Sequence, residues 1–363
     1  MNGARLSSGT VVAHAGDPPP PLVPLIIDRL AREAIEEETL ALGATRAVGS
    51  GHRLLEEEPD ELRTCFEHDR DRILHSTAFR RLAGKTQVFV FPADHQRTRL
   101  THALEVAQVA TAVARAVGLN VALTEAMALG HDCGHGPGGH ASEEAFDPFI
   151  PEGYHHALWG ADVVLPRLNL CGETLDGIRH HSWSLPTPTT PEGVVTSWAD
   201  RCAYSAHDLE DAVSAGIVSP LDVPDSVVEV LGATRSSQLD SLITALVSTI
   251  GNTGTVGMDA THAGALADLR AFNYERIYRR PASVEQTRAV VKVLGALVEH
   301  FASNPSLLSE LASTPAVEAD CVRAAVTYVA GMTDRFAFDT AVRLLDWPSD
   351  ELPQGIDFPR PTF

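Results

Sequence analysis

Residues 131–144 read HDCGHGPGGHASEE, and they follow the helix-like stretch VALTEAMALG at residues 121–130. Thr124 is suited to cap a helix that runs to Leu129, and the glycines and proline that follow Asp132 break the helical pattern. His131 and Asp132 are therefore predicted near the C-terminus of a helix. Apolar residues recur at helical spacing elsewhere in the chain, and strand-like runs are scarce. The sequence thus predicts an all-α fold with little β structure.

Length and charge narrow the class of protein. The 363 residues are 44% hydrophobic, which is enough for two average domains or one large helical domain, and their formal net charge is −20. That charge argues against a surface built to hold nucleic acid. Five scattered cysteines form no CxxC pair, and no uncharged apolar stretch is as long as a membrane span. We expect a cytoplasmic protein without membrane contact.

The chain divides into three parts. Residues 1–25 include GDPPPPLVP and are expected to form a flexible, proline-rich leader. Residues 26–346 are expected to form the core, and residues 347–363 a loose proline-rich tail. Within the core, residues 222–257 carry an apolar pattern that Ser, Thr and Gly interrupt.

Helices are expected on either side of that interrupted segment. Pro191 suits the first turn of a helix that carries Asp200, Tyr204 and Asp208 on one face. A second helical set is expected from about residue 262 to residue 311. One last helix is expected to run from Ala324 through Tyr328 and Met332 to Leu345.

Four of these polar residues form a candidate metal site. His131 and Asp132 offer adjacent nitrogen and oxygen ligands to a divalent metal, and His102 offers a third ligand. The polar face of the later helix supplies a fourth ligand in Asp200. Two imidazoles and two carboxylates suit Mn, Fe, Mg or Zn better than a soft metal, and they leave coordination positions for water or a phosphate oxygen.

The order H…HD…D resembles that of the HD-domain superfamily. Several longer segments resemble its deoxynucleoside triphosphate triphosphohydrolase branch, the dGTPase-like proteins: DRDRILHSTAFRRLAGKTQVF from residue 69, RTRLTHALEVAQVA from 97, HDCGHGPGGHASEE from 131, WADRCAYSAHDLEDAVSAG from 198 and YVAGMTDRF from 328. The resemblance implies an HD-domain helical fold with additional C-terminal helices. It also implies hydrolysis of a dNTP, with dGTP as one candidate, at the α-phosphorus to give deoxynucleoside and tripolyphosphate.

The resemblance also implies roles for single residues. His102, His131, Asp132 and Asp200 would hold the divalent metal, with Mg or Mn foremost and Fe, Co or Zn as alternatives. His140 matches the catalytic histidine of the family and would move a proton near neutral pH. Glu143 lies one helical turn further on and would orient the His140 ring.

Further positions match residues that bind the substrate in the family. Arg99 and Arg201 match residues that hold the triphosphate, although some relatives carry lysine where this chain has Arg201. His156 fits a histidine near the phosphates, with the adjacent His155 as the alternative register. Contacts to the sugar or phosphates are implied for the remaining positions, the last three by approximate position alone: Tyr204, Asp208, Gln87, Arg270 and Tyr278.

Histidines 180 and 181 lie in the segment RHHSW. His181 aligns with a family histidine whose usual neighbours are Lys and Asn. In this chain the neighbours are His180 and Ser182, so the resemblance does not carry a role over to His181.

Two other functions fit the same residues. One is an HD-type phosphohydrolase that acts on mono- or cyclic nucleotides, and the other is a catalytically weak regulator that binds nucleotides. The family also implies a homo-oligomer with effector dNTPs at subunit contacts. Base preference depends on loops without a readable pattern, so the sequence leaves it open.

Overall fold

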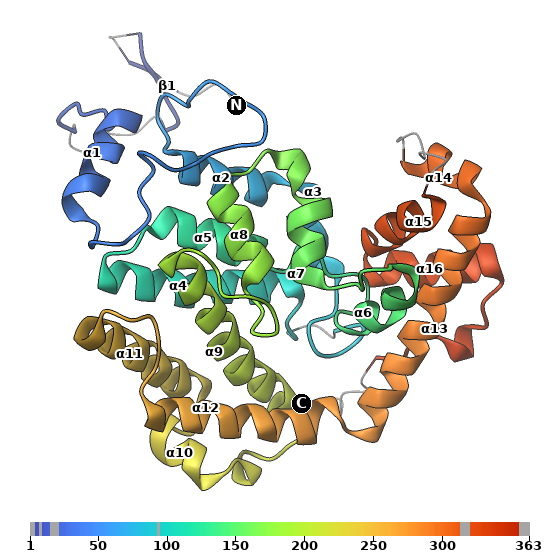
Figure 1. Cartoon of the computed structure of the whole chain (residues 1–363). Coiled ribbons are helices and arrows are strands. Elements are labelled where there is room, and N and C mark those ends of the chain that lie inside the picture. Colours follow the sequence, from blue (N-terminus) through green and yellow to red (C-terminus); the bar gives the residue numbers. More distant parts are fainter. Residues whose placement is uncertain (1–3, 7–8, 15–21, 93–94, 313–319, 356–363) are drawn as a thin grey trace.

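The computed structural model describes residues 4–6, 9–14, 22–92, 95–312 and 320–355, and this part of the chain is almost entirely helical (Figure 1). The strands β1 (Ala4–Arg5) and β2 (Val11–Val12) pair in antiparallel fashion. The expectation of an all-α fold with little β structure is confirmed for the described residues. In chain order the helices are α1 (Arg29–Thr39), α2 (Cys65–His75), α3 (Thr77–Arg81), α4 (Arg99–Val117), α5 (Val121–Gly130), α6 (Ala141–Phe146), α7 (His156–Trp159), α8 (Gly172–His180), α9 (Pro191–Ser214), α10 (Asp225–Leu231), α11 (Arg235–Thr253), α12 (Ala260–Asn273), α13 (Pro281–Ser303), α14 (Pro305–Ala312), α15 (Cys321–Ala330) and α16 (Asp334–Leu345).

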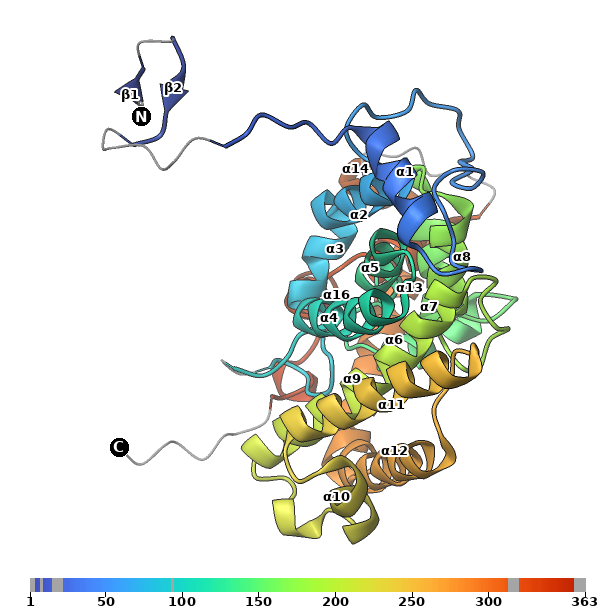
Figure 2. The same ribbon diagram turned by 90° about the vertical axis from the view of Figure 1, so that its left-hand side faces the viewer.

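Helices α4, α5 and α9 pack on one another at the centre of the molecule (Figures 1 and 2). Helix α4 buries Val106, Ala110 and Val113 completely, and these side chains belong to the largest of three hydrophobic clusters among the described residues. Gly118 ends α4 at a φ of 72°, a left-handed conformation that glycine adopts without a steric penalty. The large cluster therefore fixes the three helices that carry the predicted metal ligands or lead into them.

Helix α5 begins earlier than the sequence suggested. Its cap is Asn120, whose side chain accepts a hydrogen bond from the backbone N–H of Leu123 at 3.1 Å. Thr124 lies inside the helix and donates its hydroxyl to the carbonyl oxygen of Asn120. The prediction of Thr124 as the cap is therefore wrong. The Asn120 side chain, four residues earlier, accepts the hydrogen bond from the first turn of the helix. The prediction that His131 follows the end of this helix is confirmed.

Helix α9 begins as the sequence predicts. Pro191 occupies its first turn, and the Thr190 hydroxyl accepts from the backbone N–H of Gly193. The helix continues for 24 residues. Its polar face, with Asp200, Tyr204 and Asp208, lines a cavity rather than open solvent.

A second hydrophobic cluster joins α6 to the C-terminal helices. Phe146 of α6 packs there with Leu294 and Phe301 of α13 and with Phe338 of α16. The chain leaves α5 in the first cluster and enters α6 in the second, so residues 131–140 lie where the two clusters meet. The glycine-rich segment is thus held at both ends by packed helices.

The C-terminal region differs from the single last helix that was expected. Gly331, Met332 and Thr333 separate α15 from α16, and Thr333 caps α16 by accepting from the N–H of Phe336. The break matters because it places Asp334 at the first position of α16, beside the glycine-rich segment. Residues 222–257, whose pattern was unreadable, contain α10 and α11.

Both ends of the chain are described only in part. Residues 15–21 of the expected leader and 356–363 of the expected tail lie outside the described residues. The described residues 22–27 form no helix or strand, and β1 and β2 lie beyond them, away from the helical body (Figure 2). In the tail, Trp347 and Leu352 pack against the second hydrophobic cluster. The flexibility of the leader and of the remaining tail stays a prediction.

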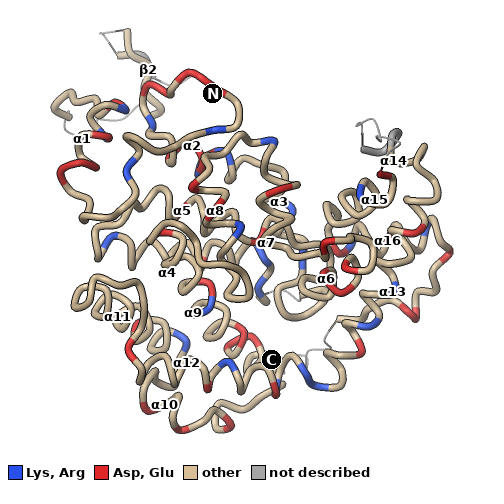
Figure 3. The backbone as a smooth tube through the Cα atoms, in the orientation of Figure 1, with Lys and Arg blue, Asp and Glu red and all other residues tan. Residues whose placement is uncertain are grey.

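Aspartate and glutamate occur along most helices of the described chain (Figure 3). The excess of acidic residues behind the negative net charge is therefore not confined to one segment. No helix in the described part is both long and apolar enough to cross a membrane.

Gly134 shows how tightly the segment after α5 is packed. A Cβ at this position would lie 2.0 Å from the carbonyl oxygen of His156 and 2.4 Å from the backbone nitrogen of Gly160. We predict that Gly134→Ala lowers the free energy of unfolding by about 3 kcal/mol, because backbone atoms must move. Urea unfolding followed by circular dichroism measures the change.

The matched control is Gly295→Ala in the middle of α13, where no heavy atom lies within 4 Å of the added Cβ. This variant should raise the free energy of unfolding by about 0.5–1 kcal/mol through helix propensity. Equal effects of the two substitutions would contradict the packing described here.

Candidate metal centre and its cavity

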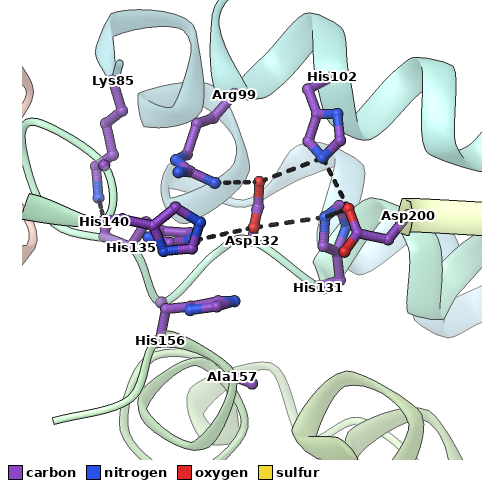
Figure 4. A network of polar contacts seen from close by, with 12 residues as sticks. Lys85, Arg99, His102, His131, Asp132, His135, His140, His156, Ala157 and Asp200 are labelled. Atoms are coloured by element: carbon purple, nitrogen blue, oxygen red, sulfur yellow. Dashed lines mark hydrogen bonds and ion pairs between the residues drawn. The ribbon is translucent and has the colours of Figure 1, made fainter. Parts of the chain in front are cut away.

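The four predicted metal ligands lie together at the junction of α4, α5 and α9 (Figure 4). Asp200 Oδ1 lies 3.0 Å from His102 Nε2 and 3.6 Å from His131 Nε2. Asp132 lies 3.4 Å from His131 Nε2 through Oδ1 and 3.9 Å from His102 Nε2 through Oδ2. Residues separated by up to 98 positions in the chain thus bring one oxygen of Asp200 and the Nε2 atoms of His102 and His131 together, with the Asp132 carboxylate beside both histidines.

The donor atoms are oriented for a cation. His131 Nδ1 lies 2.6 Å from the carbonyl oxygen of Ala128, to which it donates, and this leaves Nε2 as the nitrogen that a metal can bind in exchange for a proton. That Nε2 atom is buried and has no hydrogen-bond partner. A buried imidazole nitrogen without a partner, beside two carboxylates, fits a divalent metal with N and O ligands.

The electrostatics of the site favour positive charge. Burial opposes protonation of His131, but the carboxylates of Asp132 and Asp200 outweigh it and raise the pKa of His131 to about 9. Burial also opposes ionisation of Asp132, yet the Arg99 guanidinium holds the pKa of that carboxyl well below its usual range. Two ionised carboxylates in a buried site create a strong preference for a cation.

Arg99 ties the metal centre to the cavity wall. Its Nη1 donates to Asp132 Oδ2 at 2.8 Å, and both side chains are almost completely buried. Its Nε and Nη2 are buried without a hydrogen-bond partner, although Arg99 lines the cavity. These donors are therefore available to an anion that reaches the metal centre.

A second group of polar side chains lies on the other side of Asp132. Glu143 Oε1 lies 2.8 Å from the Nδ1 atoms of both His140 and His156. The two hydrogen bonds outweigh the effect of burial and hold the pKa of the Glu143 carboxyl well below its usual range. The predicted pairing of Glu143 with His140 is present, and Glu143 also orients His156.

His135 joins the two groups and is a site residue that was not expected from the sequence. Its Nε2 lies 3.2 Å from Asp132 Oδ1, and its ring stacks on His156 with a centroid distance of 3.8 Å. Burial and the nearby Arg99 lower the pKa of His135 well below its usual value, so the ring is neutral near pH 7. The available signal was a third histidine inside the same glycine-rich segment.

Two buried charged residues hold the glycine-rich segment in place. Lys85 Nζ donates to the carbonyl oxygens of His135 and Ala330. The Asp334 carboxylate accepts from the backbone N–H of Gly138 at 2.8 Å and from Thr86 through N–H and hydroxyl at 3.0 and 2.5 Å. The C-terminal helices therefore contribute directly to the position of the histidines.

These residues surround a cavity of about 460 Å³. His131 lies beneath the cavity, Glu143 lies behind His140 and His156, and Arg270 lies behind Tyr204; none of the three is a lining residue. The other predicted site residues line it: Gln87, Arg99, His102, Asp132, His140, His156, Asp200, Arg201, Tyr204, Asp208 and Tyr278.

Tyr204, Asp208 and Tyr278 form one end of the cavity. The Tyr278 hydroxyl donates to Asp208 Oδ2, and Arg270 Nε donates to the Tyr204 hydroxyl at 2.6 Å. Asp208 Oδ1 is buried without a partner. Arg270 thus acts on the cavity through Tyr204, whereas Asp208 presents an acceptor to whatever occupies this end.

The structure also separates the paired histidines. His156 lines the cavity, whereas His155 is partly exposed and lies 3.2 Å from the Ser184 hydroxyl. His181 lines the cavity and lies 3.1 Å from His156 through the two Nε2 atoms, whereas His180 pairs with Asp176 on α8. Trp183 also lines the cavity and was not singled out from the sequence.

We predict that His102→Ala and Asp200→Ala each abolish binding of Mn, because each removes one of four ligands from a buried site. Metal content after reloading and gel filtration, measured by mass spectrometry, tests this. Glu144→Ala, an exposed change one residue from Glu143, should keep the metal. Metal retained by the first two variants would show that the ligand set is different.

Asp208 should make stability depend on pH. Burial raises its pKa to about 6, above the usual value of 3.8. Between about pH 4 and pH 6 the unfolded protein loses this proton more readily than the folded protein does. The free energy of unfolding therefore falls over this pH range. We predict that Asp208→Asn raises the free energy of unfolding by about 3 kcal/mol at pH 8 and by about half as much at pH 5. Urea titrations of both proteins at the two pH values measure this, and a gain that is independent of pH would contradict it.

The fold has a counterpart among solved structures. A hypothetical protein from Aquifex aeolicus matches with a TM-score of 0.50 and 17% sequence identity, over 78% of this chain and 69% of that chain. At this identity the likeness concerns the fold alone.

Comparisons of the sequence identify the family as well as the fold. Family models match the HD domain at residues 99–205 and the phosphohydrolase-associated domain at residues 256–343. Deoxyguanosinetriphosphate triphosphohydrolase-like proteins from Caldanaerobacter subterraneus, Clostridium tetani and Desulfatibacillum aliphaticivorans are 39%, 35% and 38% identical, each over 84% of this chain and 92%, 92% and 94% of the relative. The first model contains all four predicted metal ligands, and these identities extend over most of the length. The chain therefore belongs to the deoxyguanosinetriphosphate triphosphohydrolase-like family of HD-domain proteins.

Proposed function

We propose that this protein hydrolyses a dNTP at the α-phosphorus, with a divalent metal, and releases deoxynucleoside and tripolyphosphate in one step. The observation that carries the proposal is a cluster of His and Asp side chains, with His102, His131 and Asp200 spaced to hold a metal and Asp132 beside His131, next to a cavity with Arg99 and Arg201 in its wall. The names of the relatives point to dGTP as the first substrate to test.

Separate side chains would bind the metal and the phosphates. His102, His131, Asp132 and Asp200 would hold the metal, which when bound polarises the α-phosphate oxygens and offsets the charge that develops on them. Arg99 presents its free Nε and Nη2 donors to the phosphates from beside the metal ligand Asp132.

Proton transfer falls to His140. Its Nδ1 is occupied by Glu143, so Nε2 is the ring nitrogen that is free to exchange a proton. The ring lines the cavity, and Nε2 is suited to donate a proton to the departing 5′ oxygen. Glu143 acts as a positioning residue, because it fixes the tautomer and the orientation of the ring.

Tyr204, Asp208 and Tyr278 would contact the sugar of the substrate. The buried Asp208 Oδ1 can accept a hydrogen bond from a sugar hydroxyl, and the ring of Tyr204 lines the same end of the cavity. A close-packed aromatic ring rejects a 2′ hydroxyl by shape, which favours deoxyribose.

Product analysis tests the proposal. The protein is incubated with dGTP and with each other dNTP, alone and in mixtures, in Mn and separately in Mg, and the products are resolved by ion exchange. Equal amounts of deoxynucleoside and tripolyphosphate are expected. Pyrophosphate or single phosphate without tripolyphosphate would favour a phosphohydrolase of another type. Stabilisation of the fold by dNTP without turnover would favour a nucleotide-binding regulator.

We further predict that Glu143→Ala lowers kcat by about 10²-fold or more, since general acid catalysis typically contributes 10²–10⁴-fold, while the protein keeps its metal. Glu144→Ala serves again as the matched control and should keep wild-type kcat. Loss of metal from the Glu143 variant would instead place this carboxylate among the ligands.

A further inference from the structure

Trp183 occupies an unusual position at the rim of the cavity. It follows α8 in the chain, lines the cavity, and is 46% exposed, which is high for so large an aromatic residue. Neither the metal centre nor the His140–Glu143 pair uses it. An exposed tryptophan in a cavity wall is a candidate contact for a ligand or for a neighbouring side chain.

The indole ring is held in one orientation. Its Nε1 donates to the carbonyl oxygen of Ser197 at 3.2 Å, and the ring forms a T-shaped contact with Trp198, with centroids 4.7 Å apart and an interplanar angle of 77°. The Ser197 hydroxyl in turn donates to the carbonyl oxygen of His181, two residues before Trp183. Helix α9 thus fixes both the backbone before Trp183 and the ring itself.

The guanidinium of Arg201 stacks on the ring of Trp183. The Cζ atom of Arg201 lies 3.4 Å from the Trp183 ring centroid, closer than any other cation–π contact among the described residues. No carboxylate in the described part of the chain forms an ion pair with Arg201, and its Nε is buried without a hydrogen-bond partner. The guanidinium is therefore held by stacking, with its donors left for a ligand.

The two arginines of the cavity lie at different depths. Arg99 is 2% exposed and contacts the metal ligand Asp132, whereas Arg201 is half-buried beside an exposed tryptophan. An anion that engages both must extend from the metal centre to the rim. A chain of several phosphates fits this requirement, and a single phosphate bound beside Asp132 does not need the rim.

We propose that Trp183 is a positioning residue that holds Arg201 flat at the rim, so that the cavity selects a linear polyphosphate over a single phosphate. The inference rests on the proposed function for the identity of the substrate. Arginine suits this position, since a planar guanidinium stacks on the indole face over its whole area.

The test compares Trp183→Ala, Trp183→Phe and Arg201→Ala with the double variant that carries both alanines. Binding of inorganic tripolyphosphate and of inorganic phosphate to the Mn-loaded protein is measured by calorimetry, and kcat and KM are measured with dGTP. Arg323→Lys is the matched control, because Arg323 stacks on Trp159 at 5.1 Å outside the cavity.

Trp183→Ala is expected to weaken tripolyphosphate binding about 10-fold, within the range of cation–π energies, and to raise KM to a similar extent while kcat changes little. Phosphate binding should stay within about 2-fold of wild type, since only the deeper donors are needed. Trp183→Phe keeps an aromatic face and should recover most of the affinity. In the double variant the loss should equal that of Arg201→Ala alone, because Trp183 acts through Arg201.

Two results would overturn the inference by itself: wild-type affinity in Trp183→Ala, or losses that add up in the double variant. A wild-type protein that neither binds nor releases tripolyphosphate would overturn the proposed function and this inference with it. Arg323→Lys should match wild type throughout, and a loss there would show that the assay reports general stability.

Discussion

The ion pair between Asp132 and Arg99 is the constraint on which the site depends. A carboxylate that is 2% exposed is costly unless opposite charge and hydrogen bonds surround it. Arg99 comes from the first turn of α4, and the imidazoles of His131 and His135 come from the two sides of Asp132 in the chain. The start of α4 must therefore lie against the end of α5, and the large hydrophobic cluster is built around that contact. Compensation of one buried charge fixes the geometry of the metal centre.

The same reasoning explains why the C-terminal helices belong to the site. A segment rich in glycine has little packing of its own, and its backbone N–H and C=O groups need partners when they are buried. Lys85 and Asp334 supply those partners to His135 and Gly138, and Asp334 is available only because α16 begins there. The C-terminal helices thus position the glycine-rich segment through hydrogen bonds of Asp334 and of the Ala330 carbonyl oxygen, in addition to their apolar packing.

The cavity combines two kinds of unsatisfied group. Arg99 has free donors and Asp208 has a free acceptor, so an occupant must carry negative charge together with a hydroxyl or amide donor. Burial raises the pKa of Asp208, so its ionised form lowers the stability of the folded protein. Functional contacts often carry a cost of this kind. A nucleotide carries both kinds of group.

The order of residues along the chain predicted the helical class, because apolar spacing is local. The four candidate ligands and the pairing of His140 with Glu143 came from motifs that resemble those of a known family, and the fold brings these side chains together. Contacts between distant segments were beyond the sequence alone. The stacking of Trp183 on Arg201, the hold of Asp334 on Gly138, and the placement of Arg270 behind Tyr204 rather than in the cavity wall each join residues 18 to 196 positions apart. Such pairs are set by how the two hydrophobic clusters dock, and docking is decided by the packing of whole helix faces, which no local pattern encodes.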